Sequence, residues 1–375
     1  MEQHPEFPLE EGLCYLNHAA VAPWPLRTAE AVRRFTEENL HLGSKHYPQW
    51  MAVEGLLREQ LQRLINAPTA DDIALLKNTS EGLSLIAYGL DWLQGENIVI
   101  AEQEFPSNRI VWESLASQGV ETRMVDISGD DPEQALIDQM NDQTRLLSVS
   151  TVQYGSGLRM DLARLANACR ERGVLLCIDA IQGLGALQFD LQQVDADFVV
   201  ADGHKWMLGP EGLALFYCRA ELRDQLRLNQ YGWHMVEAVG DFDQQGWQVA
   251  NTARRFECGS PNMVCIHALS ASLSLLEETG YATVESEVLK RSRYLFERIK
   301  DEPKLELLTS AAEGRYAGIV TFSHINIESK RLYEQLMSEG VMCAARGGGV
   351  RFSPHFYTPY EVIDSALALA VTADL

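Results

Sequence analysis

The chain has 375 residues, of which 46% are hydrophobic and 22% are charged, an ordinary balance for a folded globular protein. This composition excludes a disordered or fibrous chain, and the length suits one sizeable domain with a smaller one beside it. Lys and Arg total 31 against 53 for Asp and Glu, so the net charge is −22. Such an acidic surface repels phosphate backbones and anionic lipids, and we therefore expect neither a nucleic-acid nor a membrane partner.

The cysteines and histidines of the sequence point to no metal or disulfide framework. The seven cysteines are scattered and form no C-x-x-C pair, and we expect those in apolar runs, such as Cys177, to be small buried hydrophobic residues. His41 and His46 are five residues apart, which is not the spacing of a helical metal pair. The first residues lack the basic start and apolar core of a signal peptide, and no apolar run is long enough to span a bilayer. We therefore expect a cytoplasmic protein without a bound metal.

Short apolar runs alternate with helical patterns over residues 97–218. The predicted strands are residues 97–101, 122–127, 145–152, 174–179, 198–201 and 213–218. The predicted helices between them are residues 107–118, 132–140 and 161–172. This alternation indicates a mostly parallel sheet covered by helices on both faces. In such sheets ligands bind beyond the carboxyl ends of the strands.

The C-terminal part of the chain has a different pattern. Helices are predicted at residues 264–279, 284–300 and 330–339, and short strands near residues 318–323, 341–344 and 350–353. The mixture indicates a smaller α+β domain. We expect a large α/β domain over residues 21–264 and a small domain formed by residues 1–20 and 265–375.

Two polar segments directly follow neighbouring predicted strands. Asp179 ends one strand, and Lys205 follows the next within Gly203-His204-Lys205-Trp206. Pyridoxal 5′-phosphate requires such a pair, because it forms a Schiff base with a lysine and places its pyridine nitrogen against a carboxylate. An aspartate and a lysine after two strands can also be surface residues. The aromatic-rich surroundings of Lys205 favour the cofactor.

These motifs carry a family resemblance. Asp179-x-x-Gln182 followed by Gly203-His204-Lys205 resembles the class V aminotransferases, the fold-type I group that includes cysteine desulfurases, selenocysteine lyases and isopenicillin epimerase. The resemblance covers nearly the whole chain and implies a homodimer that depends on pyridoxal 5′-phosphate. It also implies that Lys205 bonds to the cofactor, that Asp179 pairs with the pyridine nitrogen and that Gln182 donates to the phenolic oxygen.

The resemblance places further residues at the cofactor. Thr79 and Ser80 precede a helical run at residues 83–90, where they can be an ordinary helix cap or hold the cofactor phosphate. Asp202 and His204 also fall in the cofactor site, although a carboxylate at position 202 would repel a phosphate unless a neighbouring base binds it. Ser260 matches a loop that crosses a dimer interface and contacts the partner's phosphate.

The substrate end of the site departs from the desulfurase pattern. The resemblance places Phe105 over the cofactor ring, where desulfurases commonly have a histidine that can move protons. Arg351, and with weaker support Arg346, would bind the α-carboxylate of the substrate. Only four residues separate these arginines and none is a cysteine, while Cys343 lies on the other side in a segment predicted to be a strand. A persulfide-forming thiol is therefore not expected.

The resemblance thus predicts a reaction at the α-carbon of a small amino acid, with Lys205 as the general base. We expect an aminotransferase of class V type. The alternative is a C–S or C–Se lyase without a catalytic cysteine loop, and racemisation would use the same residues. A non-catalytic protein of the same fold is disfavoured because Lys205 is present. Candidates for side-chain specificity are Tyr154, Trp206, Trp233 and His234.

Overall fold

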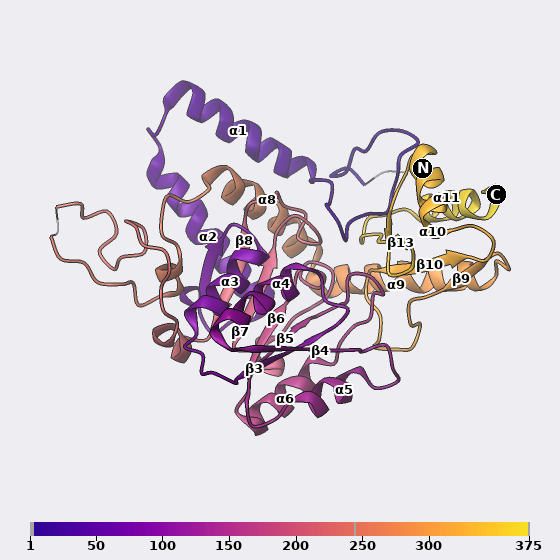
Figure 1. The fold of residues 1–375 in the computed structure, drawn as a ribbon. Coiled ribbons are helices and arrows are strands. Elements are labelled where there is room, and N and C mark those ends of the chain that lie inside the picture. The colour runs from indigo at the N-terminus through magenta and orange to yellow at the C-terminus, as the bar shows by residue number, and fades with distance from the viewer. Residues whose placement is uncertain (1–3, 244, 374–375) are drawn as a thin grey trace.

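The fold is built around one large sheet (Figure 1). The computed structural model describes residues 4–243 and 245–373. The strands of the sheet lie in the order β2-β8-β7-β6-β5-β3-β4. Their bounds are β2 (Ile73–Leu76), β3 (Asn97–Ala101), β4 (Glu121–Val125), β5 (Thr144–Ser150), β6 (Leu175–Asp179), β7 (Phe198–Asp202) and β8 (Ala214–Cys218). From β7 to β4 the strands are parallel, whereas β8 is antiparallel to both of its neighbours. The prediction of a mostly parallel sheet is confirmed.

Helices cover both faces of this sheet, as predicted. Side chains alternate along β3, so that Ile98 and Ile100 enter one hydrophobic cluster while Val99 and Ala101 enter another. The helices that follow the strands are α3 (Thr79–Gly89), α4 (Ser107–Glu113), α5 (Pro132–Gln139), α6 (Leu162–Arg172) and α7 (Leu191–Val194). Residues of α3 and α4 belong to the first cluster and residues of α5 and α6 to the second. The helix predicted at residues 107–118 ends earlier and continues as a short 3-10 segment.

Three further helices pack together beside the large sheet. They are α1 (Leu26–Leu42), α2 (Tyr47–Ile65) and α8 (Met263–Thr279), and both α1 and α2 contact α8. We predicted neither α1 nor α2, and α1 buries only Thr28 and Ala31. Short 3-10 segments complete this part of the chain: η1 (Ala70–Asp72), η2 (Ser114–Gln118), η3 (Ala220–Gln225) and η4 (Ala253–Phe256).

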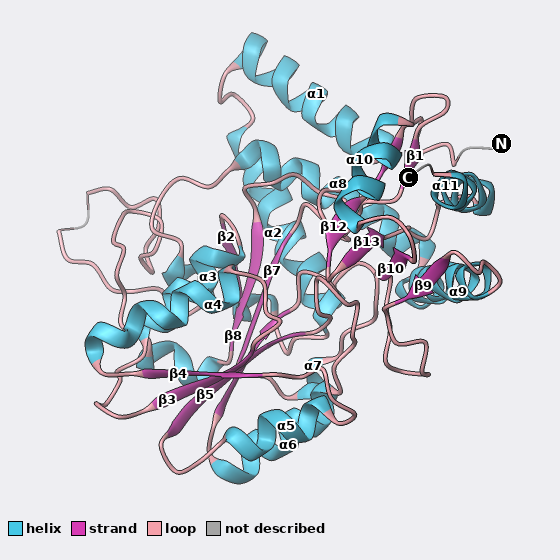
Figure 2. Cartoon of the chain, turned by 45° about the vertical axis from the view of Figure 1, so that its right-hand side comes forward, coloured by secondary structure: helices cyan, strands magenta, loops and turns pink. Residues whose placement is uncertain are grey.

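The C-terminal elements gather at one side of the molecule around a smaller sheet (Figure 2). The sheet has the antiparallel order β12-β13-β10-β9, and β1 pairs separately with β11. The bounds are β1 (Cys14–Tyr15), α9 (Tyr281–Lys300), β9 (Leu305–Leu307), β10 (Val320–His324), α10 (Ser329–Ser338), β11 (Val341–Met342), β12 (Ala344–Arg346), β13 (Gly349–Phe352) and α11 (Tyr360–Thr372). The strand predicted near residues 341–344 is present, but it is divided into two short strands, β11 and β12. Its partner changes from β1 to β13 at Cys343, which therefore lies between two strands.

Two separate hydrophobic clusters indicate where the chain divides into domains. One cluster combines the large sheet with α8, for example through Leu269, and a separate cluster joins Leu16 of the N-terminal segment to the C-terminal elements. Helix α9 contributes Val288 to the first and Leu295 to the second. The division at residue 264 remains a prediction, and we propose that the boundary lies later, within α9.

Two other expectations can be compared with the structure. Among the described residues no helix is both long and apolar enough to cross a membrane. The cysteines are free, and those at positions 14, 169, 177, 218 and 343 are buried, whereas Cys258 and Cys265 are partly exposed. The interpretation of cysteines in apolar runs as buried hydrophobic residues is confirmed.

Candidate active site

The carboxyl ends of β6 and β7 open into a pocket of about 290 Å³. Because these strands are paired in parallel, Asp179 lies directly opposite Val200, and the segment after β7 carries Lys205 into the same pocket. The predicted site residues that line it are Thr79, Ser80, Phe105, Asp179, Gln182, Asp202, His204, Lys205, Arg346 and Arg351. Lining residues that we did not predict include Ala20, Val21, Asn78, Ser107, Ile181 and Glu211.

One end of the pocket is the N-terminus of α3, which begins at Thr79 and not at residue 83 as predicted. A Cβ on Gly82 would lie 2.6 Å from Val200 Cγ1, so the first turn of the helix packs directly on β7. Ser80 Oγ donates to Ser107 Oγ at 2.9 Å. Thr79 Oγ1 is buried and has no hydrogen-bond partner within the described chain. A helix N-terminus with free backbone N–H groups and three hydroxyls is suited to bind a phosphate.

The centre of the pocket holds Asp179 and Lys205. Asp179 is 2% exposed and accepts a hydrogen bond from the Ile181 amide at 3.1 Å. Burial raises the pKa of Asp179 and lowers the pKa of Lys205, because each charged form loses contact with water. Lys205 Nζ lies 5.6 Å from the ring centroid of Phe105. The Phe105 ring is 40% exposed, and its edge packs against Tyr154 with the centroids 5.1 Å apart.

His204 and Gln182 are two further polar residues of the pocket. His204 Nδ1 lies 2.9 Å from Asp202 Oδ1, which places a base next to this carboxylate, although neither atom has a hydrogen-bond partner in the described chain. Gln182 Nε2 donates to the Ala19 carbonyl at 3.0 Å, and Gln182 Oε1 accepts from Trp206 Nε1 at 2.9 Å. Trp206 is fully buried, and its ring occupies the space beside Gly318. The prediction that Trp206 shapes specificity is therefore wrong, because Trp206 does not line the pocket and instead holds Gln182 in place by a hydrogen bond.

The opposite end of the pocket carries the two arginines. Arg351 in β13 is 2% exposed, and its Nη1 donates to the Tyr154 carbonyl at 2.8 Å. Burial, together with the nearby charge of Arg346, lowers the pKa of Arg351 to about 10. Arg351 forms no ion pair with any carboxylate in the described residues, and its buried Nε has no partner there. Arg346 is exposed and donates only to the adjacent Ala345 carbonyl, at 2.8 Å.

The connection between these arginines is a tight turn. Arg346 in β12 pairs directly with Gly349 in β13, so the turn consists of Gly347 and Gly348, with φ of 58° and 80°. This geometry leaves no place for a longer loop between the two arginines that could carry a catalytic cysteine. Within the described residues no cysteine lines the pocket. Cys343 is 2% exposed, and burial raises the pKa of its thiol to about 12, which makes it a poor nucleophile.

Several predicted residues lie outside the pocket. Ser260 is exposed in the loop before α8, and Trp233 is 39% exposed on the long segment that extends away from the body of the molecule in Figure 1. His234 is buried on the same segment, but it faces α2 and not the pocket. The predictions of a specificity role for Trp233 and His234 are therefore wrong for the pocket of this chain, whereas Tyr154 does line it.

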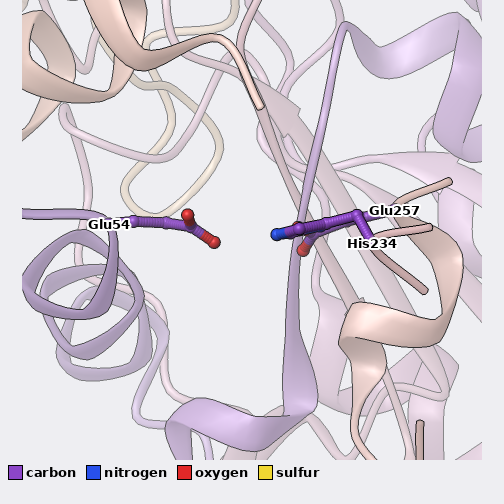
Figure 3. Close-up of side chains that lie close together, drawn as sticks. All are labelled: Glu54, His234 and Glu257. Atoms are coloured by element: carbon purple, nitrogen blue, oxygen red, sulfur yellow. The ribbon is translucent and has the colours of Figure 1, made fainter. Parts of the chain in front are cut away.

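His234 belongs to a separate buried cluster with Glu54 and Glu257 (Figure 3). The potential ligand atoms of these three residues lie within 4.8 Å of one another. However, Arg58 already binds both carboxylates, with Nη2 2.5 Å from Glu54 Oε1 and Nη1 2.5 Å from Glu257 Oε1. Glu257 Oε1 also accepts from the Leu75 amide at 2.8 Å. We therefore interpret the cluster as an ion-pair network that fastens α2 to β2 and to the segment before α8.

Comparison with known proteins identifies the family. The family model described as Aminotransferase class-V matches residues 14–363. The chain belongs to this family, whose enzymes depend on pyridoxal 5′-phosphate. A probable cysteine desulfurase of Methanothermobacter thermautotrophicus is 26% identical over 96% of this chain and 94% of that protein. The uncharacterized aminotransferase YcbU of Bacillus subtilis is 27% identical over 90% of this chain and 88% of that protein.

Solved structures confirm the fold-type I architecture. A C-DES mutant with glycine covalently linked to its pyridoxal-phosphate cofactor has a TM-score of 0.92 at 22% identity, with all of both chains covered. A complex of the cystine C–S lyase C-DES with cysteine persulfide has a TM-score of 0.89 at 22% identity, covering 98% of this chain and 100% of that one. At this identity the likeness establishes the fold.

Proposed function

We propose that this chain is a pyridoxal-phosphate-dependent C–S lyase that acts on a small sulfur-containing amino acid and does not pass the sulfur to a thiol of its own. The observation that carries the proposal is the two-residue turn between Arg346 and Arg351, together with a described pocket lining that contains no cysteine. The desulfurase relatives support sulfur chemistry, and the absence of a reactive thiol from the described pocket favours release of sulfur with the product.

The pocket residues fit the cofactor. The unpartnered hydroxyl of Thr79, with Ser80 and the amides at the start of α3, would bind the phosphate, and His204 would shield it from Asp202. Asp179 would pair with the pyridine nitrogen, and Gln182 would donate to the phenolic oxygen. When bound, pyridoxal phosphate withdraws electrons from the α-carbon and so stabilises the negative charge that develops there.

The remaining residues act on the substrate. Arg351 would bind the α-carboxylate with a guanidinium that has no carboxylate partner in the described chain, and Phe105 would exclude water from one face of the cofactor. Lys205 would take the α-proton, since burial favours its neutral amine. The same ammonium group would then donate a proton to the departing sulfur. Phe105 has no proton to donate to the sulfur. A thiol or persulfide is a good leaving group, so no second proton donor is needed.

The proposal also covers the oligomeric state and the cellular location of the enzyme. The exposed position of Ser260 supports a homodimer in which this serine reaches the phosphate of the partner's cofactor. The free cysteines and the strongly acidic composition support a cytoplasmic enzyme.

Transamination is the second candidate, because the described residues would hold the same cofactor and the relative YcbU is described as an aminotransferase. The two reactions differ in their need for an amino acceptor. We would incubate the holoenzyme with L-cystine, L-cysteine or L-selenocysteine in the absence of any keto acid. A lyase makes keto acid and ammonia over many turnovers, and it releases sulfide from L-cysteine, selenide from L-selenocysteine or cysteine persulfide from L-cystine. An aminotransferase stops after one turnover per site and resumes when a keto acid is added, and that result would refute the lyase.

A further inference from the structure

A second and larger pocket adjoins the catalytic one. It has a volume of about 880 Å³ and is lined from α6 and α7 on one side and from α9 and residues 313–315 on the other. Thr151 and Gly183 line this rear pocket, whereas Asp179 and Gln182 line the catalytic pocket. The segment that carries Asp179 therefore separates the two cavities.

The rear pocket contains polar groups that the protein itself does not satisfy. Thr151, Tyr281 and Arg315 all line it, and each has a buried atom without a hydrogen-bond partner in the described part of the chain, namely Thr151 Oγ1, Tyr281 Oη and Arg315 Nη2. Thr151 is itself only 4% exposed. Leaving a buried polar group unpaired costs about 1–3 kcal/mol, so such groups are uncommon in native proteins. Three of them from distant parts of the sequence indicate a ligand that supplies the missing partners.

The charges at this pocket indicate the kind of ligand. Each of the four lining carboxylates already has a donor. Asp190 binds the Asn66 side-chain amide at 2.7 Å, and Glu285 accepts from both the backbone and the side chain of Gln188 at 3.1 Å. Asp161 accepts from the Arg164 amide at 3.0 Å, and Glu313 accepts from Tyr316 Oη at 3.5 Å. By contrast, Arg159 is held only loosely, with Nη1 3.5 Å from Glu285 Oε1. Arg315 uses Nη1 for Glu133 and leaves Nη2 free. The groups that still lack partners are thus hydrogen-bond donors, which suit an oxyanion.

We propose that the rear pocket is a second binding site for a small molecule that carries a carboxylate or phosphate group. Its position links it to the catalytic pocket through the backbone. The Thr151 amide donates to the Asp179 carbonyl at 2.9 Å, and a Cβ on Gly183 would lie only 2.8 Å from Thr151 Oγ1. A ligand bound to Thr151 therefore contacts the residue whose amide holds the Asp179 carbonyl.

The test uses holoenzyme, whose own phosphate position is filled, and titrates it by calorimetry with inorganic phosphate and with citrate at constant ionic strength. We expect at least one of these anions to bind with a Kd below about 1 mM. Tyr281→Phe and Thr151→Val should each weaken that binding about tenfold or more. Both variants remove a hydroxyl that has no protein partner in the described chain, so they should fold normally. Tyr88→Phe, a tyrosine on α3 outside the pocket, is the matched control and should bind as the unmodified enzyme does.

Three results would overturn the proposal. The first is that neither anion saturates the protein below about 10 mM. The second is that Tyr281→Phe and Thr151→Val bind the anion as tightly as the Tyr88→Phe control. The third is loss of the cofactor's visible absorption during the titration, which would show that the anion enters the catalytic pocket. None of these results depends on which amino acid the enzyme uses, so they leave the proposed reaction untouched.

Discussion

Arg58 and Arg351 are both largely removed from water, yet their surroundings are opposite. Burial alone would lower the pKa of Arg58, but Glu257 and Glu54 outweigh that effect and hold the pKa above its ordinary value. Arg351 has no such carboxylate in the described residues, and burial lowers its pKa to about 10. One arginine has its anions supplied by the chain, whereas the other is held ready for an anion from outside.

The same contrast separates the two buried regions as a whole. In the cluster of Figure 3 the carboxylates of Glu54 and Glu257 are each paired with Arg58 at 2.5 Å, although Glu54 Oε2 and His234 Nδ1 have no hydrogen-bond partner in the described chain. In the catalytic pocket Asp179 and Lys205 are buried with few partners, and burial shifts the pKa of each toward its neutral form. A buried charge without a partner of opposite charge reduces stability unless something binds it, so the unpaired charge of Arg351 favours a ligand-binding site.

The largest expected effect is on the catalytic side of this comparison. Lys205→Ala should lower turnover about 10³- to 10⁴-fold, because it removes both the cofactor bond and the base. Steady-state release of keto acid measures this. Lys300→Ala, an exposed lysine at the end of α9, is the control and should retain full activity. Equal activity in the two variants would remove Lys205 from the mechanism.

The reverse pattern is expected at the paired cluster. Arg58→Met should lower the free energy of unfolding by about 3 kcal/mol or more, because it leaves the carboxylates of Glu54 and Glu257 buried without their cation. Chemical denaturation of the apoenzyme measures this. Arg34→Met, on the exposed surface of α1, should change stability by less than about 0.5 kcal/mol. If Arg58→Met were as stable as Arg34→Met, the cluster would not fasten the fold.

Arg351→Gln tests the contrast with Arg58 directly. It removes a buried positive charge, and because no carboxylate among the described residues pairs with Arg351, it leaves no carboxylate without a partner. Stability should stay constant or rise, whereas kcat/KM for an amino acid should fall about 10- to 100-fold as a charge-assisted hydrogen bond is lost. Arg346→Gln, at the exposed rim, should have a much smaller effect. A larger loss of kcat/KM for Arg346→Gln would exchange their proposed roles.

The smallest effect is a displaced pH profile. The neutral amine of Lys205 reacts with pyridoxal phosphate, and burial lowers the pKa of this amine below the ordinary value of 10.5. The rate at which apoenzyme captures the cofactor should therefore rise with pH and level off at a midpoint below that value. Stopped-flow absorbance follows the reaction. A midpoint at the ordinary lysine value would mean that the amine is not desolvated.

The sequence predicted the catalytic pocket better than its surroundings. Asp179 and Lys205 could be placed together because apolar runs mark the ends of β6 and β7, and parallel pairing then brings those ends to one edge. Ser107 was missed because its link to the site is the hydrogen bond to Ser80, 27 residues earlier, which no local pattern reveals. Its place just before an apolar helical run was the only local signal.

The errors at Trp206 and His234 share one cause. Trp206 and His234 were chosen for their chemistry and their nearness in sequence to other candidates, but side-chain direction decides what they contact. The Trp206 side chain donates to Gln182 Oε1, and His234 Nδ1 lies 3.6 Å from Glu257 Oε2. The two-residue turn after Arg346 was different, since the short spacing to Arg351 was itself visible in the sequence.

The most direct test of a thiol-free lyase is the intact mass of the enzyme, measured without reductant while it turns over L-cystine or L-cysteine. We predict that keto acid accumulates together with sulfide from L-cysteine or cysteine persulfide from L-cystine, while the mass of the polypeptide stays unchanged. A gain of one sulfur atom on a cysteine, formed and discharged at the rate of turnover, would contradict the account and show that the enzyme itself carries the sulfur.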